Sequence, residues 1–190
     1  MAKKALIVVD VQNDFCPDGA LAVPKGDEVV GPINKLVAEF VENGNLVVYT
    51  KDYHPADHVS FKVNHAQGLW PPHCVQNTWG VEFHPDLAVN GETFLKAFLS
   101  DQDSYSAFGG HIEADPGAQS LAAYLSAQGV DEVTVVGLAL DYCVKSTAID
   151  AHNLGLRATV LLDATRAVDV NPDDGDKAVE EMKSLGIAVQ

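Results

Sequence analysis

Four residues with acid–base, nucleophilic or ion-pairing side chains lie at the ends of apolar segments or just after them. They are Asp10 at the end of ALIVVD, Asp52 at the end of NLVVYTKD, Lys96 late in TFLKAF, and Cys143 shortly after VTVVGLAL. A thiol near a helix N-terminus is acidified by the helix dipole and by a neighbouring cation, and its thiolate is a competent nucleophile. Partial burial would raise the pKa of Asp10 and make it a suitable base. The set therefore indicates nucleophilic catalysis.

Each of these residues also has an ordinary structural explanation. A single cysteine is more often a small buried apolar residue, and Cys16 and Cys74 fit that description because neither follows a strand at a helix start. Asp10 could instead bind backbone N–H groups of the loop that follows it, and Lys96 could face water from an edge strand. An ion pair between Asp10 and Lys96 is the other explanation, because half-buried lysines are uncommon unless they are paired.

A second cluster combines an aspartate with histidines. Asp52 and His54 form an Asp-x-His pattern at a predicted strand end, His58 follows four residues later, and His73 lies in WPPHC. A carboxylate and imidazoles that leave coordination positions open are typical of a working metal site rather than a structural one. Zinc, iron and manganese all accept this ligand set, so the residue types do not choose among them. Capping residues or a pH-sensitive loop would be the alternative.

The apolar segments that carry these residues are typical of parallel strands buried on both faces, because they are rich in Val and Leu and do not alternate. They cover residues 5–10, 45–52, 93–98, 133–140 and 158–163, and residues 187–189 add a short sixth strand.

Helical spacing of apolar residues predicts helices over 27–43, with Pro32 in the first turn, and over 117–128 and 141–154. A last helix is predicted to open at Asn171-Pro172, a cap followed by proline, and to close at Gly186. Strands that alternate with helices predict an α/β sheet with right-handed crossovers.

Residues 53–91 break this alternation, since they are rich in Pro, His, Trp and Asn and show no clear period. A loop of that length inside a compact domain is usually functional. In an open parallel sheet, ligands bind beyond the carboxyl ends of the strands. We therefore expect Asp10, Asp52, Lys96 and Cys143 at one edge of the sheet, beside a loop-rich insertion that contributes metal and substrate contacts.

Composition limits the classes of function. The 190 residues are expected to form one domain over 1–190. The formal net charge is -15 and the twelve Lys and Arg residues are scattered, so we expect no nucleic acid as a partner. No apolar segment is long enough to span a bilayer, and the run after the N-terminal lysines ends at Asp10 without a cleavage site, so no membrane is expected either. Three cysteines, an odd number, favour free thiols in a reducing compartment, and the cytoplasm is the expected location.

Five motifs occur in order along the chain: IVVDVQNDFC (7–16), KDYHPADHVSF (51–61), WPPHCVQNTWGVEF (70–83), DSYSAF (103–108) and VGLALDYCVKST (136–147). Together they strongly resemble the nicotinamidases and pyrazinamidases of the isochorismatase-like cysteine hydrolases. The match is specific as a set, although each motif alone is weak. The resemblance implies a three-layer doubly wound sheet of about six parallel strands in the order 3-2-1-4-5-6, with helices on both faces.

The resemblance also implies roles for individual positions. The catalytic triad of the family is matched by Asp10, Lys96 and Cys143. Its metal ligands are matched by Asp52, His54 and His73, and a further ligand of some members is matched by His58. The aromatic pair that sandwiches the pyridine ring is matched by Phe15 and Trp70, and further substrate contacts are expected from Leu21 and Tyr105. The Leu138-Ala139 bond matches one that is cis in the family, which directs the backbone N–H groups of Ala139 and Cys143 into an oxyanion hole.

The activity implied is the hydrolysis of nicotinamide to nicotinic acid and ammonia through a thioester on Cys143, a reaction of NAD salvage, with pyrazinamide also accepted. The partner is then a small pyridine carboxamide, and the cofactor is one divalent metal ion that binds the pyridine nitrogen. Zinc is the first expectation, with iron and manganese as alternatives. Homo-oligomer formation is left open.

Three other functions remain as alternatives. The first is a metal-free isochorismatase-like or carbamoyl amidohydrolase, and the second is a metallohydrolase in which the metal activates water. The third is a non-catalytic binding module, which has little support because DVQNDF, and no Gly-rich phosphate loop, follows the first strand.

Overall fold

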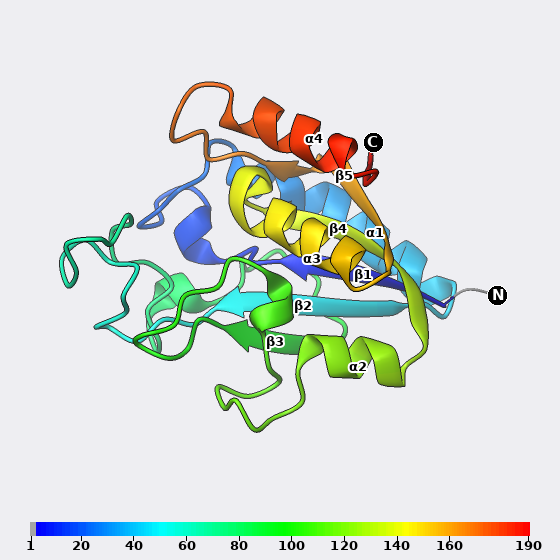
Figure 1. Ribbon diagram of the computed structural model, residues 1–190, viewed down its shortest axis with the longest axis horizontal. Helices are drawn as coiled ribbons and strands as arrows, with labels where there is room; N and C mark the ends of the chain where they lie inside the picture. Colours follow the sequence, from blue (N-terminus) through cyan, green and yellow to red (C-terminus); the bar gives the residue numbers. More distant parts are fainter. Residues whose placement is uncertain (1–2) are drawn as a thin grey trace.

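Six parallel strands form one sheet in the order β3-β2-β1-β4-β5-β6 in the computed structural model, which describes residues 3–190 (Figure 1). The strands are β1 (Lys3–Val9), β2 (Leu46–Asp52), β3 (Glu92–Lys96), β4 (Val130–Leu138), β5 (Arg157–Arg166) and β6 (Ala188–Val189). The strand order, the parallel pairing and the position of each strand confirm the predicted fold. The prediction placed the ends of β3 and β4 two residues too late, and β5 continues beyond the predicted 158–163.

Helices cover both faces of the sheet, as predicted, and each face has its own apolar core. On one face α1 (Val30–Glu42) packs through Val30, Ile33 and Val37 against Leu6 and Val8 of β1. The other face carries α2 (Leu121–Ala127), α3 (Lys145–Asn153) and α4 (Asp174–Ser184). Residues 5–9 of β1 enter the two cores alternately and are inaccessible to solvent, which explains why this part of the strand is apolar throughout.

Two helix starts were predicted wrongly. The second helix begins at Leu121 rather than at 117, because the Ser120 hydroxyl accepts a hydrogen bond from the Ala123 N–H and caps the helix there. The last helix begins at Asp174, so Asn171-Pro172 does not open it. Asp173, directly before it, has a φ of 68° in the left-handed region, so a right-handed helix cannot run from Pro172 into α4.

The other helix predictions agree with the structure apart from their first turns. Pro32 lies in the first turn of α1, as expected, and a 3₁₀ turn, η2 (Gly26–Val29), precedes it. The predicted helix 141–154 starts with one π-helical turn, η5 (Leu140–Val144), before it continues as α3. The predicted cis peptide bond joins Leu138 and Ala139. Cys143 therefore lies in a π-helical turn directly after β4.

The predicted loop-rich segment 53–91 is irregular. Within it, where every residue is described, the only helical turn is the 3₁₀ turn η3 (Trp79–Val81), and single bridges join His54 to Val75 and Phe61 to Trp70. Two more 3₁₀ turns, η1 (Asn13–Phe15) and η4 (Ala107–Gly109), follow β1 and β3. The segment 53–91 extends beyond the carboxyl ends of the strands, at the left of Figure 1.

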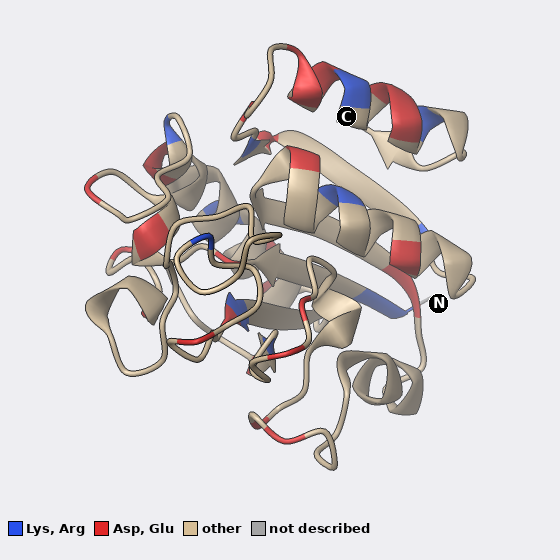
Figure 2. Ribbon diagram, turned by 60° about the vertical axis from the view of Figure 1, so that its left-hand side comes forward, with Lys and Arg blue, Asp and Glu red and all other residues tan. Residues whose placement is uncertain are grey.

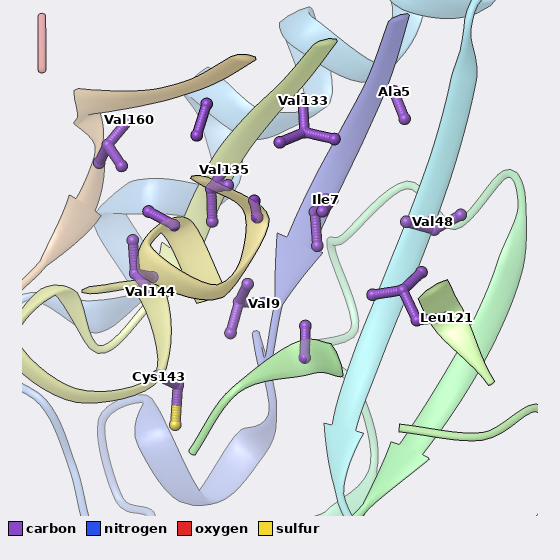
Figure 3. Packing of buried hydrophobic residues seen from close by; sticks show 14 of the residues in the cluster. Ala5, Ile7, Val9, Val48, Leu121, Val133, Val135, Cys143, Val144 and Val160 are labelled. Atoms are coloured by element: carbon purple, nitrogen blue, oxygen red, sulfur yellow. The ribbon is translucent and has the colours of Figure 1, made fainter. Parts of the chain in front are cut away.

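Figure 3 shows how the core leads to this edge. Val9 of β1, Val135 of β4 and Val144 pack together, and Cys143 lies at the end of the cluster where the strand arrows end, with its sulfur directed away from Val144. In the described part of the chain, no helix combines the length and the apolar character that crossing a bilayer requires. Figure 2 shows Lys and Arg dispersed among the more numerous Asp and Glu residues.

Candidate active site

The four chemistry-bearing residues of the sequence meet at one edge of the sheet. Asp10 follows β1, Asp52 and Lys96 are the last residues of β2 and β3, and Cys143 lies in η5 just after β4. Since β3, β2, β1 and β4 are neighbours, their carboxyl ends lie side by side. All four side chains are buried, and Asp10 and Lys96 are completely inaccessible to solvent.

Lys96 is the centre of this group. Its Nζ lies 3.0 Å from Asp10 Oδ2 and 3.5 Å from Cys143 Sγ, and it also donates hydrogen bonds to Asp52 Oδ1 and, at 3.2 Å, to the carbonyl oxygen of Ser104. Oxygen or sulfur ligand atoms of Asp10, Asp52 and Cys143 all lie within 4.8 Å of one another. The ion pair between Asp10 and Lys96 is therefore present. Although β3 is an edge strand, the alternative in which Lys96 faces water is wrong.

The charges of this buried group can be assigned from its contacts. Burial alone would lower the pKa of Lys96, but Asp10 and Asp52 raise it well above its ordinary value, so the ammonium stays charged. Burial raises the pKa of Asp10 to about 6, against the opposing effects of Lys96 and of the Thr50 hydroxyl, which donates to Oδ1 at 2.7 Å. Burial also raises the pKa of the Cys143 thiol well above its usual range despite Lys96 nearby, so the acidified thiol expected from the sequence is wrong for the free site. At neutral pH the site thus holds a thiol next to a carboxylate.

Asp10 is suited to accept the thiol proton. Its Oδ2 accepts no well-aligned hydrogen bond from another described residue, although it forms the 3.0 Å ion pair with Lys96. A base with a pKa near the working pH is the most effective in general acid–base catalysis. The arrangement can therefore generate a thiolate on Cys143 and later return the proton to a leaving group.

The second cluster also assembles as predicted. One carboxylate oxygen of Asp52 and one ring nitrogen each of His54 and His73 lie within 4.8 Å of one another, and all three side chains are buried. Asp52 Oδ2 is 3.6 Å from His54 Nε2 and 3.9 Å from His73 Nε2. The Nδ1 atoms face backbone carbonyl oxygens instead, of Ala97 at 3.1 Å for His54 and of Pro71 at 2.8 Å for His73.

This donor set fits a divalent metal ion. A carbonyl partner at Nδ1 fixes the proton there and leaves Nε2 as a free ligand atom, which is the usual support of metal-binding histidines. Burial lowers the pKa of His73 to about 4, so its ring is neutral as a metal ligand must be. Lys96 and the histidines hold the pKa of Asp52 below its ordinary value although burial opposes them, so this ligand is ionised. Two buried carboxylates facing one ammonium leave a negative charge for a cation to balance.

His58, the further ligand expected in some members of the family, lies behind this cluster. Its ring stacks on His54 with centroids 4.2 Å apart. Both ring nitrogens have partners, Ser60 Oγ at 2.8 Å and the carbonyl oxygen of Gln102 at 3.0 Å. In this structure His58 therefore supports His54 and directs no ring nitrogen toward Asp52 and His73.

A pocket opens above Cys143. It is lined by every substrate contact expected from the sequence, Phe15, Leu21, Trp70 and Tyr105, together with Ala139 and the metal-site residues. Trp70 donates its indole N–H to the Tyr105 hydroxyl at 3.1 Å, which fixes one wall. A narrow, largely apolar pocket with a nucleophile at its floor suits a small flat ring that carries a reactive group.

The sequence did not identify all of the pocket lining. Tyr142 packs edge-on against Trp70, with ring centroids 4.9 Å apart, and its position beside Cys143 could have suggested this role. Val23 and Val168 also line the pocket. The sequence could not identify Val168 as a pocket residue, because the sequence motifs do not extend to its segment of the chain.

Comparison with known proteins agrees with this geometry. The isochorismatase domain matches residues 4–190. The nicotinamidase of Saccharomyces cerevisiae is 40% identical over 98% of this chain and 98% of its own length.

Two solved structures share the fold over nearly their whole length. The pyrazinamidase of Pyrococcus horikoshii in complex with zinc has 42% identity and a TM-score of 0.87, over 99% of this chain and 98% of its own. The yeast nicotinamidase bound to the inhibitor nicotinaldehyde has 37% identity and a TM-score of 0.84, over 98% of each chain.

Proposed function

Because the chain belongs to the isochorismatase family, we propose that it is an amidohydrolase that converts nicotinamide to nicotinic acid and ammonia. The observation that carries this proposal is the contact of Lys96 with both Asp10 and Cys143 at the floor of a pocket that fits a small ring. Full-length similarity to nicotinamidases selects the pyridine amide among the possible substrates. Pyrazinamide, which has a ring of the same size, is proposed as a second substrate.

The first half of the reaction transfers the nicotinoyl group to the enzyme. Asp10 takes the proton of Cys143, and the thiolate attacks the amide carbon to form a C–S bond. The oxyanion forms against the backbone N–H groups of Ala139 and Cys143, and each such donor contributes about 3 kcal/mol to transition-state stabilisation. Asp10 then gives its proton to the amide nitrogen, the C–N bond breaks, and ammonia leaves behind a thioester.

The second half releases the acid. Asp10, again ionised, takes a proton from water, and the water oxygen attacks the thioester carbon. The C–S bond breaks and Cys143 recovers the proton, so that nicotinic acid leaves and the free thiol is restored. Throughout both halves, the Lys96 ammonium balances the negative charge that moves between Asp10 and Cys143. Phe15 and Trp70 hold the ring between them, which fixes the amide over the sulfur.

Asp52, His54 and His73 are the residues that would hold a divalent metal, which when bound supplies a Lewis-acid site for the pyridine nitrogen. Zinc is proposed as the ion because the similar pyrazinamidase of Pyrococcus horikoshii was solved with zinc, and iron or manganese would suit the same ligands. The buried free thiols Cys16, Cys74 and Cys143 support a reducing compartment, and we place the protein in the cytoplasm.

Ammonia release from nicotinamide tests the proposal. The Cys143→Ala variant is expected to lose turnover by about 10⁴-fold or more, as nucleophile removal does in other hydrolases. The matched control is Cys16→Ala, which removes another buried thiol that does not line the pocket and should keep its activity. Mass spectrometry of acid-quenched enzyme should find nicotinoyl on Cys143. Full turnover by Cys143→Ala would refute the nucleophile and favour a metal-activated water instead.

A metal-free isochorismatase-like or carbamoyl amidohydrolase is the alternative function, and the Asp52, His54 and His73 cluster counts against it. Removal of metal by a chelator should raise the KM for nicotinamide, and added zinc should restore it. Activity that is indifferent to the chelator, together with loss of metal from the protein, would favour the metal-free alternative.

A further inference from the structure

A buried carboxylate outside the triad and the metal cluster joins three loops of the pocket. Asp14, in the turn η1, is 8% exposed and forms no ion pair with any residue that the structure describes. Its Oδ1 accepts the backbone N–H of Ala20 at 3.0 Å, and its Oδ2 accepts the backbone N–H of Cys74 at 2.7 Å. Its own carbonyl oxygen accepts the N–H of Leu21 at 3.0 Å.

The contact with Cys74 reaches both histidines of the metal cluster. The N–H that Asp14 holds belongs to the peptide bond between His73 and Cys74. The carbonyl oxygen of Cys74 in turn accepts the backbone N–H of His54 at 3.0 Å. Cys74 has a φ of 45°, in the left-handed region that non-glycine residues seldom adopt, so its conformation needs such outside support.

The contacts with Ala20 and Leu21 reach the ring pocket. They close the loop that runs from Phe15 to Leu21, and both of those side chains line the pocket. Gly80 packs directly on the carboxylate, because a Cβ atom at that position would lie 1.9 Å from Asp14 Oδ2. One carboxylate therefore ties the Phe15 and Leu21 wall to the His73 and His54 backbone, and the turn η3 packs against it.

We infer that Asp14 is a positioning residue that holds the metal-binding histidines and the ring pocket in a fixed position relative to each other. The inference rests on the proposed function for the identity of the metal and of the ring, whereas the contacts of Asp14 are independent of it. The Asp14 carboxylate forms its hydrogen bonds with Ala20 and Cys74 and not with Cys143 or Lys96, so it acts on metal and ring binding and leaves the thiol chemistry unchanged.

Asp14→Asn tests the inference with little change in shape. An amide has one acceptor oxygen, so one of the two N–H groups must face an NH₂ group instead. Loss of support behind metal-binding histidines typically weakens metal affinity by about 10- to 100-fold, and we expect the lower end, since Asp14 acts through one intervening peptide. The KM for nicotinamide should rise by a similar factor at saturating zinc, with kcat changed less.

Gly80→Ala is the second variant, because the new Cβ displaces the carboxylate without altering its chemistry. Asp18→Asn is the matched control, an exposed acid of the same loop that should behave as wild type. Zinc affinity is measured by competition with a chromophoric chelator, KM and kcat by ammonia release, and triad integrity by the rate at which iodoacetamide alkylates Cys143.

Weaker zinc binding and a higher KM in both variants, with an unchanged alkylation rate, would support the positioning role. Wild-type zinc affinity in folded Asp14→Asn would overturn it. Loss of affinity in step with loss of folded protein in both variants would also overturn it, because the role would then be structural. Failure of the wild type to hydrolyse nicotinamide would refute the proposed function instead, and the zinc comparison would still decide the role of Asp14.

Discussion

The hydroxyl of Thr50 should set the pH at which the enzyme loses activity in acid. Thr50 is fully buried in β2, and its Oγ1 donates to Asp10 Oδ1 at 2.7 Å. This bond stabilises the ionised carboxylate and so lowers the pKa of Asp10, which burial raises to about 6. Thr50→Val removes the bond and keeps the shape of the side chain. Its backbone carbonyl, which accepts the Asp10 N–H at 3.2 Å, is unaffected.

The magnitude follows from the strength of such a bond. A hydrogen bond to a charged group contributes about 1.5–3 kcal/mol, and one pKa unit corresponds to about 1.4 kcal/mol. The pKa of Asp10 should therefore rise by about one to two units in Thr50→Val. Asp10 must be ionised to take the Cys143 proton, so activity is lost as pH falls through this pKa. The acid limb of the profile should move from about pH 6 to between about pH 7 and 8.

The assay is kcat/KM for nicotinamide, from ammonia release, between about pH 5 and pH 9 at saturating zinc. Thr165→Val is the matched control, because it removes another buried hydroxyl, one that donates to the Gly137 carbonyl oxygen and not to Asp10. Its acid limb should coincide with that of the wild type. An acid limb in Thr50→Val that stays in place or moves to lower pH would refute Asp10 as the base.

Three further substitutions test the neighbours of the reacting groups. Lys96→Met leaves two buried carboxylates without a cation and should lower the free energy of unfolding by about 3–5 kcal/mol. The loss should be smaller at acid pH, where Asp10 becomes protonated, and urea unfolding at two pH values measures the difference. Asp141→Asn removes one acceptor from a carboxylate that holds the N–H groups of Val168 and Asp169 at 2.9 Å each. Faster amide hydrogen exchange at these residues and a higher KM are expected, and unchanged exchange would contradict the role. Tyr105→Phe removes the oxygen that fixes the Trp70 indole and should raise KM by about fivefold, equivalent to a hydrogen bond of about 1 kcal/mol, with kcat nearly unchanged.

The sheet and its reactive edge could be predicted because burial on both faces leaves a plain signal in the sequence. A central parallel strand must be apolar at every position, so a charged residue that ends such a run stands out. Asp10 and Asp52 do this, Lys96 interrupts a weaker apolar run in the edge strand β3, and the strand order then brings the three together without any knowledge of their contacts.

The start of the last helix could not be read in the same way, because it depends on the backbone conformation of a single residue. Asn171-Pro172 has the form of a cap and a first helical residue, but Asp173 adopts a left-handed conformation, with a φ of 68°, and the helix starts only after it. Aspartate is one of the few non-glycine residues that adopt this conformation, but it does so at a minority of positions, so sequence preference alone does not locate the break.

The supporting polar residues of the site were missed for a different reason. Asp14 meets the Cys74 N–H across 60 residues of sequence, and Gln12 binds both the N–H and the carbonyl oxygen of Asp52 across 40. Such bonds leave no periodicity, and an aspartate or glutamine after a strand is as easily a solvated loop residue. Their role is visible only when the fold shows that they are buried and which backbone groups they satisfy.

Asp52 links the two halves of the site more closely than separate motifs suggest. Its Oδ1 accepts from Lys96 while its Oδ2 faces the Nε2 atoms of His54 and His73, so one carboxylate belongs to both the charge balance of the proposed triad and the proposed set of metal ligands. Neutralising it by substitution would therefore leave Lys96 with Asp10 alone and remove a proposed ligand at the same time. Burial raises the pKa of this carboxyl, but the ammonium and the two imidazoles beside it lower the pKa by more, so the carboxylate stays ionised. The placement of β2 between β3 and β1 makes this sharing possible, because it sets the end of β2 beside both Lys96 and Asp10.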